Sequence, residues 1–211
     1  MSRVRTAVLI SGRGSNLSAL IDAARAADYP AQIALVISNR EDAQGLAVAE
    51  EAGVPAKVIP HKDYAAREEF DAAIDAALRE ADIALVCEAG FMRIHSEWFV
   101  KRWEGRLLNI HPSLLPAFPG IRVHQQALDA GVKISGCTVH FIVPELDAGP
   151  IIAQAAVPVL QGDTPETLAA RILEQEHHLY PTALRLLASG TIMLKSGKCV
   201  TSQTPLWNPA D

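Results

Sequence analysis

Strand-like and helix-like segments alternate along the first half of the chain, and this order constrains the fold more than any other feature. Apolar runs at residues 4–10, 33–37, 56–59 and 83–87 have the length and composition of buried strands. Segments with a helical spacing of apolar residues, at 16–27, 42–52 and 63–80, separate these runs. Parallel strands need such crossovers, so the order predicts an α/β fold with a Rossmann-like, mostly parallel sheet and helices on both faces.

The pattern changes after a fifth apolar run at residues 107–110. We expect a helix at 123–130, an antiparallel pair of strands at 137–143 and 151–159, and then a long helix. Asp163 is placed to cap this helix, with Pro165 in its first turn and Glu166 completing a capping box. We predict a single domain over residues 1–190, followed at 191–211 by a C-terminal hairpin and tail.

Size, charge and cysteine usage limit the classes of function. The 211 residues suffice for one α/β domain, and 49% hydrophobic content is ordinary for a globular protein. The net charge of −5 argues against nonspecific nucleic-acid binding, which needs basic surface, but allows a local pocket for a small anion. The apolar runs are too short for a signal peptide or a bilayer span, so we expect no membrane partner. The three cysteines form no Cys-x-x-Cys pair, which favours reduced thiols and a cytoplasmic location.

The strand end at residues 107–116 carries the side chains best suited to chemistry. Asn109 and His111 are two residues apart, so on a strand they point to the same face. Pro112 ends the regular ladder directly after them. An amide donor beside a group that titrates near neutral pH suits a reaction with developing oxyanion charge and proton transfer. The alternative is that both residues only cap backbone groups.

A glycine loop at residues 11–17 joins the first strand to the first helix. Gly12 and Gly14 permit close backbone approach, and free amide groups at the start of a helix favour an anion. Ser15 and Asn16 add side-chain donors. A tight strand-to-helix turn without a ligand is the alternative.

A phosphate site fits this loop better than a dinucleotide site. Leu17 stands where the dinucleotide motif has its third glycine. Ser38, Asn39 and Arg40 follow the second strand, where an acidic residue would bind an adenosine ribose. The sequence therefore favours recognition of a monophosphate.

Several motifs in order resemble the family of folate-dependent phosphoribosylglycinamide formyltransferases, over residues 4–190. They are the glycine loop at 11–17, Ala-Gly-Phe-Met-Arg-Ile at 89–94, Asn-Ile-His-Pro-Ser-Leu-Leu-Pro at 109–116, Val-His-Phe at 139–141, Glu-Leu-Asp-x-Gly-Pro at 145–150 and Gln-Glu-His at 175–177. The resemblance implies formyl transfer from N10-formyltetrahydrofolate to the amine of glycinamide ribonucleotide in de novo purine biosynthesis. It implies no metal.

The resemblance also implies a role for each matching residue. The phosphate and ribose of the acceptor would be held by Gly14, Ser15, Asn16 and Glu176. The formyl-folate would be bound by Arg67, Met92, Arg93, Ile94, His95, Asn109, Val143, Pro144, Glu145, Leu146 and Asp147. Catalysis would depend on Asn109, His111 and Asp147.

In the implied mechanism, the acceptor amine attacks the formyl carbon directly and a tetrahedral intermediate forms. Asn109 donates to its oxygen, while His111, as an imidazolium, stabilises the same charge and helps to pass a proton. Asp147 favours the charged imidazole and orients a water. No separate nucleophile is required, so we interpret Cys87 as a core residue. His140, in the middle of a strand, is interpreted in the same way.

Three residues depart from the family pattern, and each is expected to change ligand affinity. His95 stands where the family usually has an apolar residue, Arg13 replaces the usual Asn, and Leu173 occupies a position that can be polar. Within formyl-folate enzymes, a formyltetrahydrofolate hydrolase and a transfer-RNA formyltransferase are alternatives, but each usually carries an extra domain. A noncatalytic nucleotide-binding module would leave Asn109, His111 and Asp147 unexplained. A monomer and a homodimer both stay open.

Overall fold

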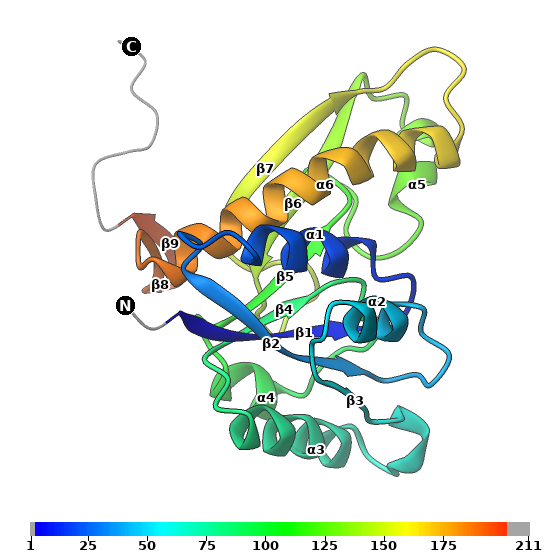
Figure 1. The fold of residues 1–211 in the computed structure, drawn as a ribbon. Coiled ribbons are helices and arrows are strands. Elements are labelled where there is room, and N and C mark those ends of the chain that lie inside the picture. The colour runs from blue at the N-terminus through cyan, green and yellow to red at the C-terminus, as the bar shows by residue number, and fades with distance from the viewer. Residues whose placement is uncertain (1–2, 202–211) are drawn as a thin grey trace.

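A seven-stranded sheet forms the centre of the computed structural model, which describes residues 3–201 (Figure 1). The strands, in chain order, are β1 (Val4–Ile10), β2 (Ala31–Ser38), β3 (Ala56–Val58), β4 (Leu85–Glu88), β5 (Leu107–His111), β6 (Ile134–Phe141) and β7 (Ile151–Pro158). Their order across the sheet is β3-β2-β1-β4-β5-β6-β7. The first five strands are parallel, and β6 and β7 run antiparallel to their neighbours. The predicted mostly parallel sheet with an antiparallel pair is confirmed.

Helices cover both faces of this sheet (Figure 1). One face carries α1 (Ser15–Ala24), α2 (Gly45–Glu51) and α6 (Pro165–Ala188), and the other carries α3 (Arg67–Glu80) and α4 (Glu97–Arg102). Alternate residues of β1 point to opposite faces of the sheet. Val8 and Ile10 pack in the core beneath α1 and α6, whereas Ala7 and Leu9 pack in the core beneath α3 and α4. Burial on both faces explains why residues 7–10 of β1 form a continuous apolar run.

The predicted cap of α6 is wrong. Thr164, not Asp163, is the N-cap: its hydroxyl accepts from the Thr167 amide at 3.3 Å, and Thr167 Oγ1 accepts from the Thr164 amide at 2.9 Å. Glu166 is therefore not the residue that completes the capping box. Asp163 instead accepts from the Arg171 guanidinium at 2.8 and 2.9 Å. These bonds hold the pKa of Asp163 far below its usual range.

Two shorter elements complete the described chain. The helix α5 (Val123–Asp129) packs on α6, and β8 (Ile192–Lys195) pairs with β9 (Lys198–Thr201) as an antiparallel hairpin. The predicted tail from residue 202 lies outside the described residues. Over residues 3–201, no helix combines the length and the apolar character needed to cross a bilayer.

The strand order reverses at β1, and this reversal positions the site. The chain leaves β1 toward β2 on one side, whereas β4 lies on the other side. Loops that follow neighbouring parallel strands at such a point diverge and leave a crevice beyond their carboxyl ends. Since β1, β4 and β5 are parallel, the loops that follow them lie at the same edge of the sheet and border this crevice.

Candidate active site

A cavity of about 1000 Å³ opens at this edge. Residues 12–16 after β1, 88–95 around the end of β4 and 109–112 around the end of β5 line it, together with 120–124, 142–147 and one side of α6. Its volume suits ligands the size of a cofactor or drug.

The cavity brings together the predicted site residues with one exception. Its lining includes Gly14, Ser15, Asn16, Met92, Arg93, Ile94, His95, Asn109, His111, Val143, Pro144, Glu145, Leu146, Asp147 and Glu176. The three departures from the family pattern, Arg13, His95 and Leu173, also line it. Arg67 is the first residue of α3 and is not among the lining residues, so its role in cofactor binding stays a prediction.

Backbone conformation and two contacts place Asp147 beside the end of β5. Its backbone has a φ of +51°, a left-handed conformation that few residues other than glycine adopt. The Gly120 amide donates to Asp147 Oδ2 at 2.8 Å, and the same oxygen lies 3.5 Å from His111 Nδ1. The side chains of His111 and Asp147 are only 6% and 8% exposed, so this pair interacts with little solvent screening.

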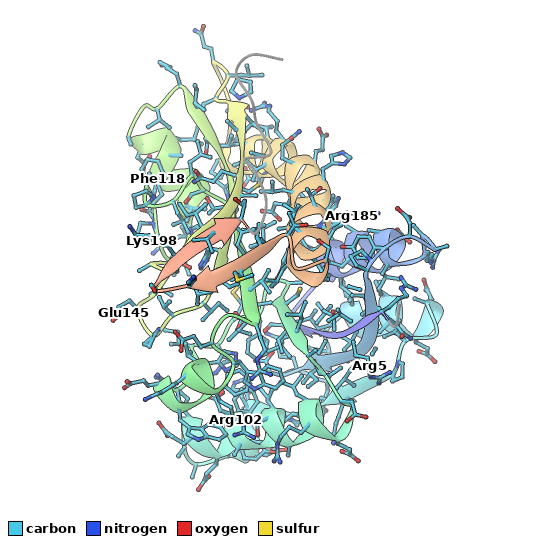
Figure 2. The ribbon with its side chains drawn as sticks, turned by 90° about the vertical axis from the view of Figure 1, so that its left-hand side faces the viewer. Arg5, Arg102, Phe118, Glu145, Arg185 and Lys198 are labelled. Atoms are coloured by element: carbon cyan, nitrogen blue, oxygen red, sulfur yellow. The ribbon has the colours of Figure 1, made fainter. Side chains whose placement is uncertain are left out.

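The contact made by the second nitrogen of His111, Nε2, determines which ring nitrogen carries a proton. His111 Nε2 lies 2.9 Å from the carbonyl oxygen of Phe118, a residue labelled in Figure 2. A carbonyl only accepts, so Nε2 carries a proton and donates it. The Nδ1 edge, next to Asp147, is therefore the edge at which a proton can be gained or lost.

His140 is a site residue that the sequence interpretation missed. Its Nδ1 donates to the Phe141 carbonyl at 2.8 Å, which leaves Nε2 to accept from Asn109 Nδ2 at 3.3 Å. Burial lowers the pKa of His140, in agreement with a neutral ring. The ring therefore orients the Asn109 amide, and His140 Nε2 lies 3.9 Å from Asp147 Oδ1. Asn109 and His140 are opposite partners in the β5–β6 register, a signal that appears only once the two strands are paired.

The glycine loop after β1 is in close contact with several distant parts of the chain. Gly14 has a φ of +80°, and a Cβ there would lie 2.5 Å from the Cα of Gly45, so the position requires glycine. Asn16 Nδ2 donates to Glu176 Oε2 at 2.6 Å, which joins the start of α1 to α6. Burial raises the pKa of Glu176. The Ser11 hydroxyl accepts from the Met92 amide at 2.8 Å and so connects this loop with the one after β4.

These groups suit transfer between two bound molecules. The amide, imidazole and carboxylate lie together in the lining of the cavity, and the same lining includes a helix start with hydroxyl and amide donors. Cys87 is fully buried, and burial raises the pKa of its thiol to about 12, so it is unsuited to act as a nucleophile. Among residues 3–201, no group of three or more His, Cys, Asp and Glu side chains is arranged to hold a metal ion.

Residues 4–184 match the formyl transferase family, and the chain belongs to this family. Its full-length relatives include phosphoribosylglycinamide formyltransferase from Haemophilus influenzae, which is 43% identical over 90% of both chains. The solved structure of glycinamide ribonucleotide transformylase 1 from Symbiobacterium toebii is 48% identical and has a TM-score of 0.91 over 94% of both chains. The human trifunctional purine biosynthetic protein adenosine-3 is 56% identical over 93% of this chain, which spans only 20% of that protein. The resemblance predicted from the motifs is confirmed.

Proposed function

We propose that the protein transfers the formyl group of N10-formyltetrahydrofolate to the amine of glycinamide ribonucleotide, a step of de novo purine biosynthesis. The main support is that one cavity joins a phosphate-type loop after β1 to the group of Asn109, His111 and Asp147. The reaction takes place in the cytoplasm, with no metal and no nucleic-acid or membrane partner. The protein acts as a monomer or a homodimer.

The two substrates occupy two halves of the cavity. The phosphate of the ribonucleotide binds the amide groups and hydroxyl of residues 14–16, and Glu176 accepts from ribose hydroxyls. The folate lies along residues 92–95 and under the loop at 143–147. The acceptor amine then reaches the formyl carbon beside Asn109.

The transfer begins when the nitrogen lone pair of the acceptor attacks the formyl carbon and the carbonyl electrons move to oxygen. Asn109 Nδ2 has two hydrogens, one bound by His140, and donates the other to the new oxyanion. The attacking nitrogen loses a proton, and N10 of the folate gains one as the bond between carbon and N10 breaks. His111 Nδ1 and Asp147 orient a water that carries this proton.

Acceptor dependence tests the proposal. Purified protein mixed with formyl-folate and glycinamide ribonucleotide should release tetrahydrofolate, followed by absorbance, and yield one formylated ribonucleotide per folate, followed by mass spectrometry. Release at the same rate without the acceptor would indicate a hydrolase. Thermal stabilisation by the ribonucleotide without any turnover would indicate a noncatalytic binding module.

A further inference from the structure

A buried histidine at the wall of the cavity joins two carboxylates that the proposed chemistry does not use. His95 Nδ1 lies 2.7 Å from Asp71 Oδ1, and His95 Nε2 lies 2.8 Å from Glu88 Oε1. The side chains are 2%, 1% and 7% exposed, in that order. His95 Nδ1 donates to Asp71 Oδ1, whereas Nε2 and Glu88 Oε1 form a close ion pair without hydrogen-bond geometry. A carboxylate beside each ring nitrogen favours the imidazolium.

Aromatic rings enclose the same imidazole and favour its charge. Phe99 lies at a centroid distance of 4.2 Å and an interplanar angle of 19°, and Phe91 lies at 5.4 Å and 16°. A cation between two ring faces is attracted by their negative π-systems. Burial alone would lower the pKa of His95, but Glu88 and Asp71 outweigh it and raise this pKa to about 9.

Glu88, His95 and Asp71 join the two ends of one cavity-lining segment to each other and to α3. Glu88 ends β4, His95 closes the segment that follows, and Asp71 belongs to α3. Asp71 Oδ2 also accepts from the Ser96 amide at 2.6 Å, directly before α4. The segment between Glu88 and His95, residues 89–94, is the cavity wall that carries the exposed Met92. The contacts of His95 with Glu88 and Asp71 therefore hold the two ends of this wall segment in place.

We propose that His95 is a positioning residue for the formyl-folate half of the cavity, because its hydrogen bond to Asp71 and its ion pair with Glu88 fix the wall at residues 89–94. This inference rests on the proposed function, since it assigns that wall to the folate. Loss of the imidazolium loosens the wall. Residues 14–16 and Glu176 are held by the bond from Asn16 to Glu176, which joins α1 to α6, and the glycine loop meets the wall at the bond from the Met92 amide to Ser11. We therefore expect the geometry of this half to change less than that of the wall.

Three variants and one matched control test this role. The variants are His95→Gln, His95→Leu and the double variant with His95→Leu and Glu88→Leu, which leaves no unpaired partner at Glu88. The control is Asp75→Asn, one helical turn after Asp71 on α3. Asp75 is also buried and accepts from Arg102 Nε at 2.7 Å and from Trp103 Nε1 at 3.1 Å, but it does not line the cavity. Figure 2 shows its partner Arg102 in the layer of α3 and α4, well apart from Phe118.

We expect His95→Gln to raise KM for formyl-folate on the order of tenfold while KM for the ribonucleotide changes less than about twofold. The double variant should melt at a higher temperature than His95→Leu but keep the raised KM for formyl-folate, since both variants lack the charged contacts of His95 with Glu88 and Asp71. Asp75→Asn should lower the melting temperature without separating the two KM values. Equal changes in both KM values in His95→Gln, or a normal folate KM in the double variant, would overturn the inference.

Binding of tetrahydrofolate, measured by calorimetry, separates this inference from the proposed function. The dissociation constant should rise in His95→Gln by the same factor as KM for formyl-folate. If the parent protein binds tetrahydrofolate but transfers no formyl group, the proposed function fails and the effect of His95→Gln on binding still decides the inference. If the parent protein does not bind tetrahydrofolate, both fail.

Discussion

Asn109 and His140 share one hydrogen bond across the β5–β6 pair, and its direction decides what the amide offers the cavity. His140 Nδ1 is committed as a donor to the Phe141 carbonyl, so Nε2 can only accept from Asn109. This bond fixes the NH₂ group of Asn109, rather than its oxygen, at this position. The remaining hydrogen of the amide is then free for a developing oxyanion.

Asn109→Ala should lower kcat by a factor on the order of 10² to 10³, because a single oxyanion donor is lost. The fold should persist, since the Asn109 side chain bonds only to His140 among the described residues. Steady-state kinetics and a melting curve check both statements. Near-normal turnover in a folded variant would remove Asn109 from the chemistry.

Asp147→Asn should keep the bond from the Gly120 amide, because an amide oxygen accepts as a carboxylate oxygen does. It removes the carboxylate oxygen's charge 3.5 Å from His111 Nδ1, where the two groups orient the water of the proposed proton relay. We expect a lower kcat and a displaced pH profile of kcat. A profile that matches the parent protein in both limbs would exclude Asp147 from the proton relay.

The stability of the fold should depend on pH through His95. Its pKa is about 9 in the folded protein against 6.5 for a free imidazole, and the charged groups that face it are Asp71 of α3 and Glu88 of β4. The stabilisation is therefore complete below pH 6.5 and is lost as the pH rises through about 9. Urea unfolding from pH 6 to 10 should show this decline, and His95→Gln should flatten it. An equal decline in the variant would assign the effect to other groups.

At the scale of single elements, strand positions followed from the sequence more closely than helix ends. The predicted strand at residues 4–10 coincides with β1, because an apolar run and a glycine loop delimit it. The helix predicted from residue 63 begins as α3 at Arg67, because a 3₁₀ turn at His61–Asp63 comes first. Glu69 then accepts from the amides of Ala65 and Ala66. Several polar residues near a helix start can serve as its cap, and periodicity does not select among them.

Thr164→Ala tests the corrected cap of α6 and should lower the free energy of unfolding by about 1 kcal/mol, the usual loss for an N-cap hydroxyl. Chemical denaturation measures this change. Thr164→Ser retains a hydroxyl and should cost less than about half as much. Equal losses in the two variants would show that the hydroxyl of Thr164 does not cap the helix.

The site was predictable from the sequence to the extent that its residues are local. Asn109 and His111 share a strand face through their spacing, but Asp147 was identified only through the family resemblance. His140 and the Asp71–His95 bond depend on strand register and on helix packing, which join residues 31 and 24 positions apart. A pattern within one segment carries no signal for such contacts. The role of Arg67 in binding the formyl-folate stays a prediction.

At the scale of the whole molecule, the reversal of strand order at β1 gathers the loops into one cavity. The long helix α6 contacts α1, β6 and β7, and its Glu176 reaches the glycine loop through Asn16. Under the proposed function, α1 and α6 build the half of the cavity assigned to the ribonucleotide, and the segments after β4 and β6 build the half assigned to the folate. That residues 1–190 form a single domain stays a prediction.

This division predicts opposite kinetic signatures for the two halves. Glu176→Ala should raise KM for the ribonucleotide on the order of tenfold, because Asn16 and the ribose hydroxyls lose a buried acceptor. KM for formyl-folate should change less than about twofold. Steady-state kinetics with each substrate varied in turn will show whether the pattern mirrors that of His95→Gln. A folate KM that rises with the ribonucleotide KM would mean that the halves are not independent.

A crystal structure with glycinamide ribonucleotide and a folate analogue that cannot transfer its formyl group tests the central claim most directly. The account predicts the phosphate on residues 14–16 and the formyl oxygen about 3 Å from Asn109 Nδ2, with the acceptor amine on the other side of the formyl carbon. A phosphate bound away from the start of α1, or a formyl oxygen beyond the reach of Asn109, would contradict it.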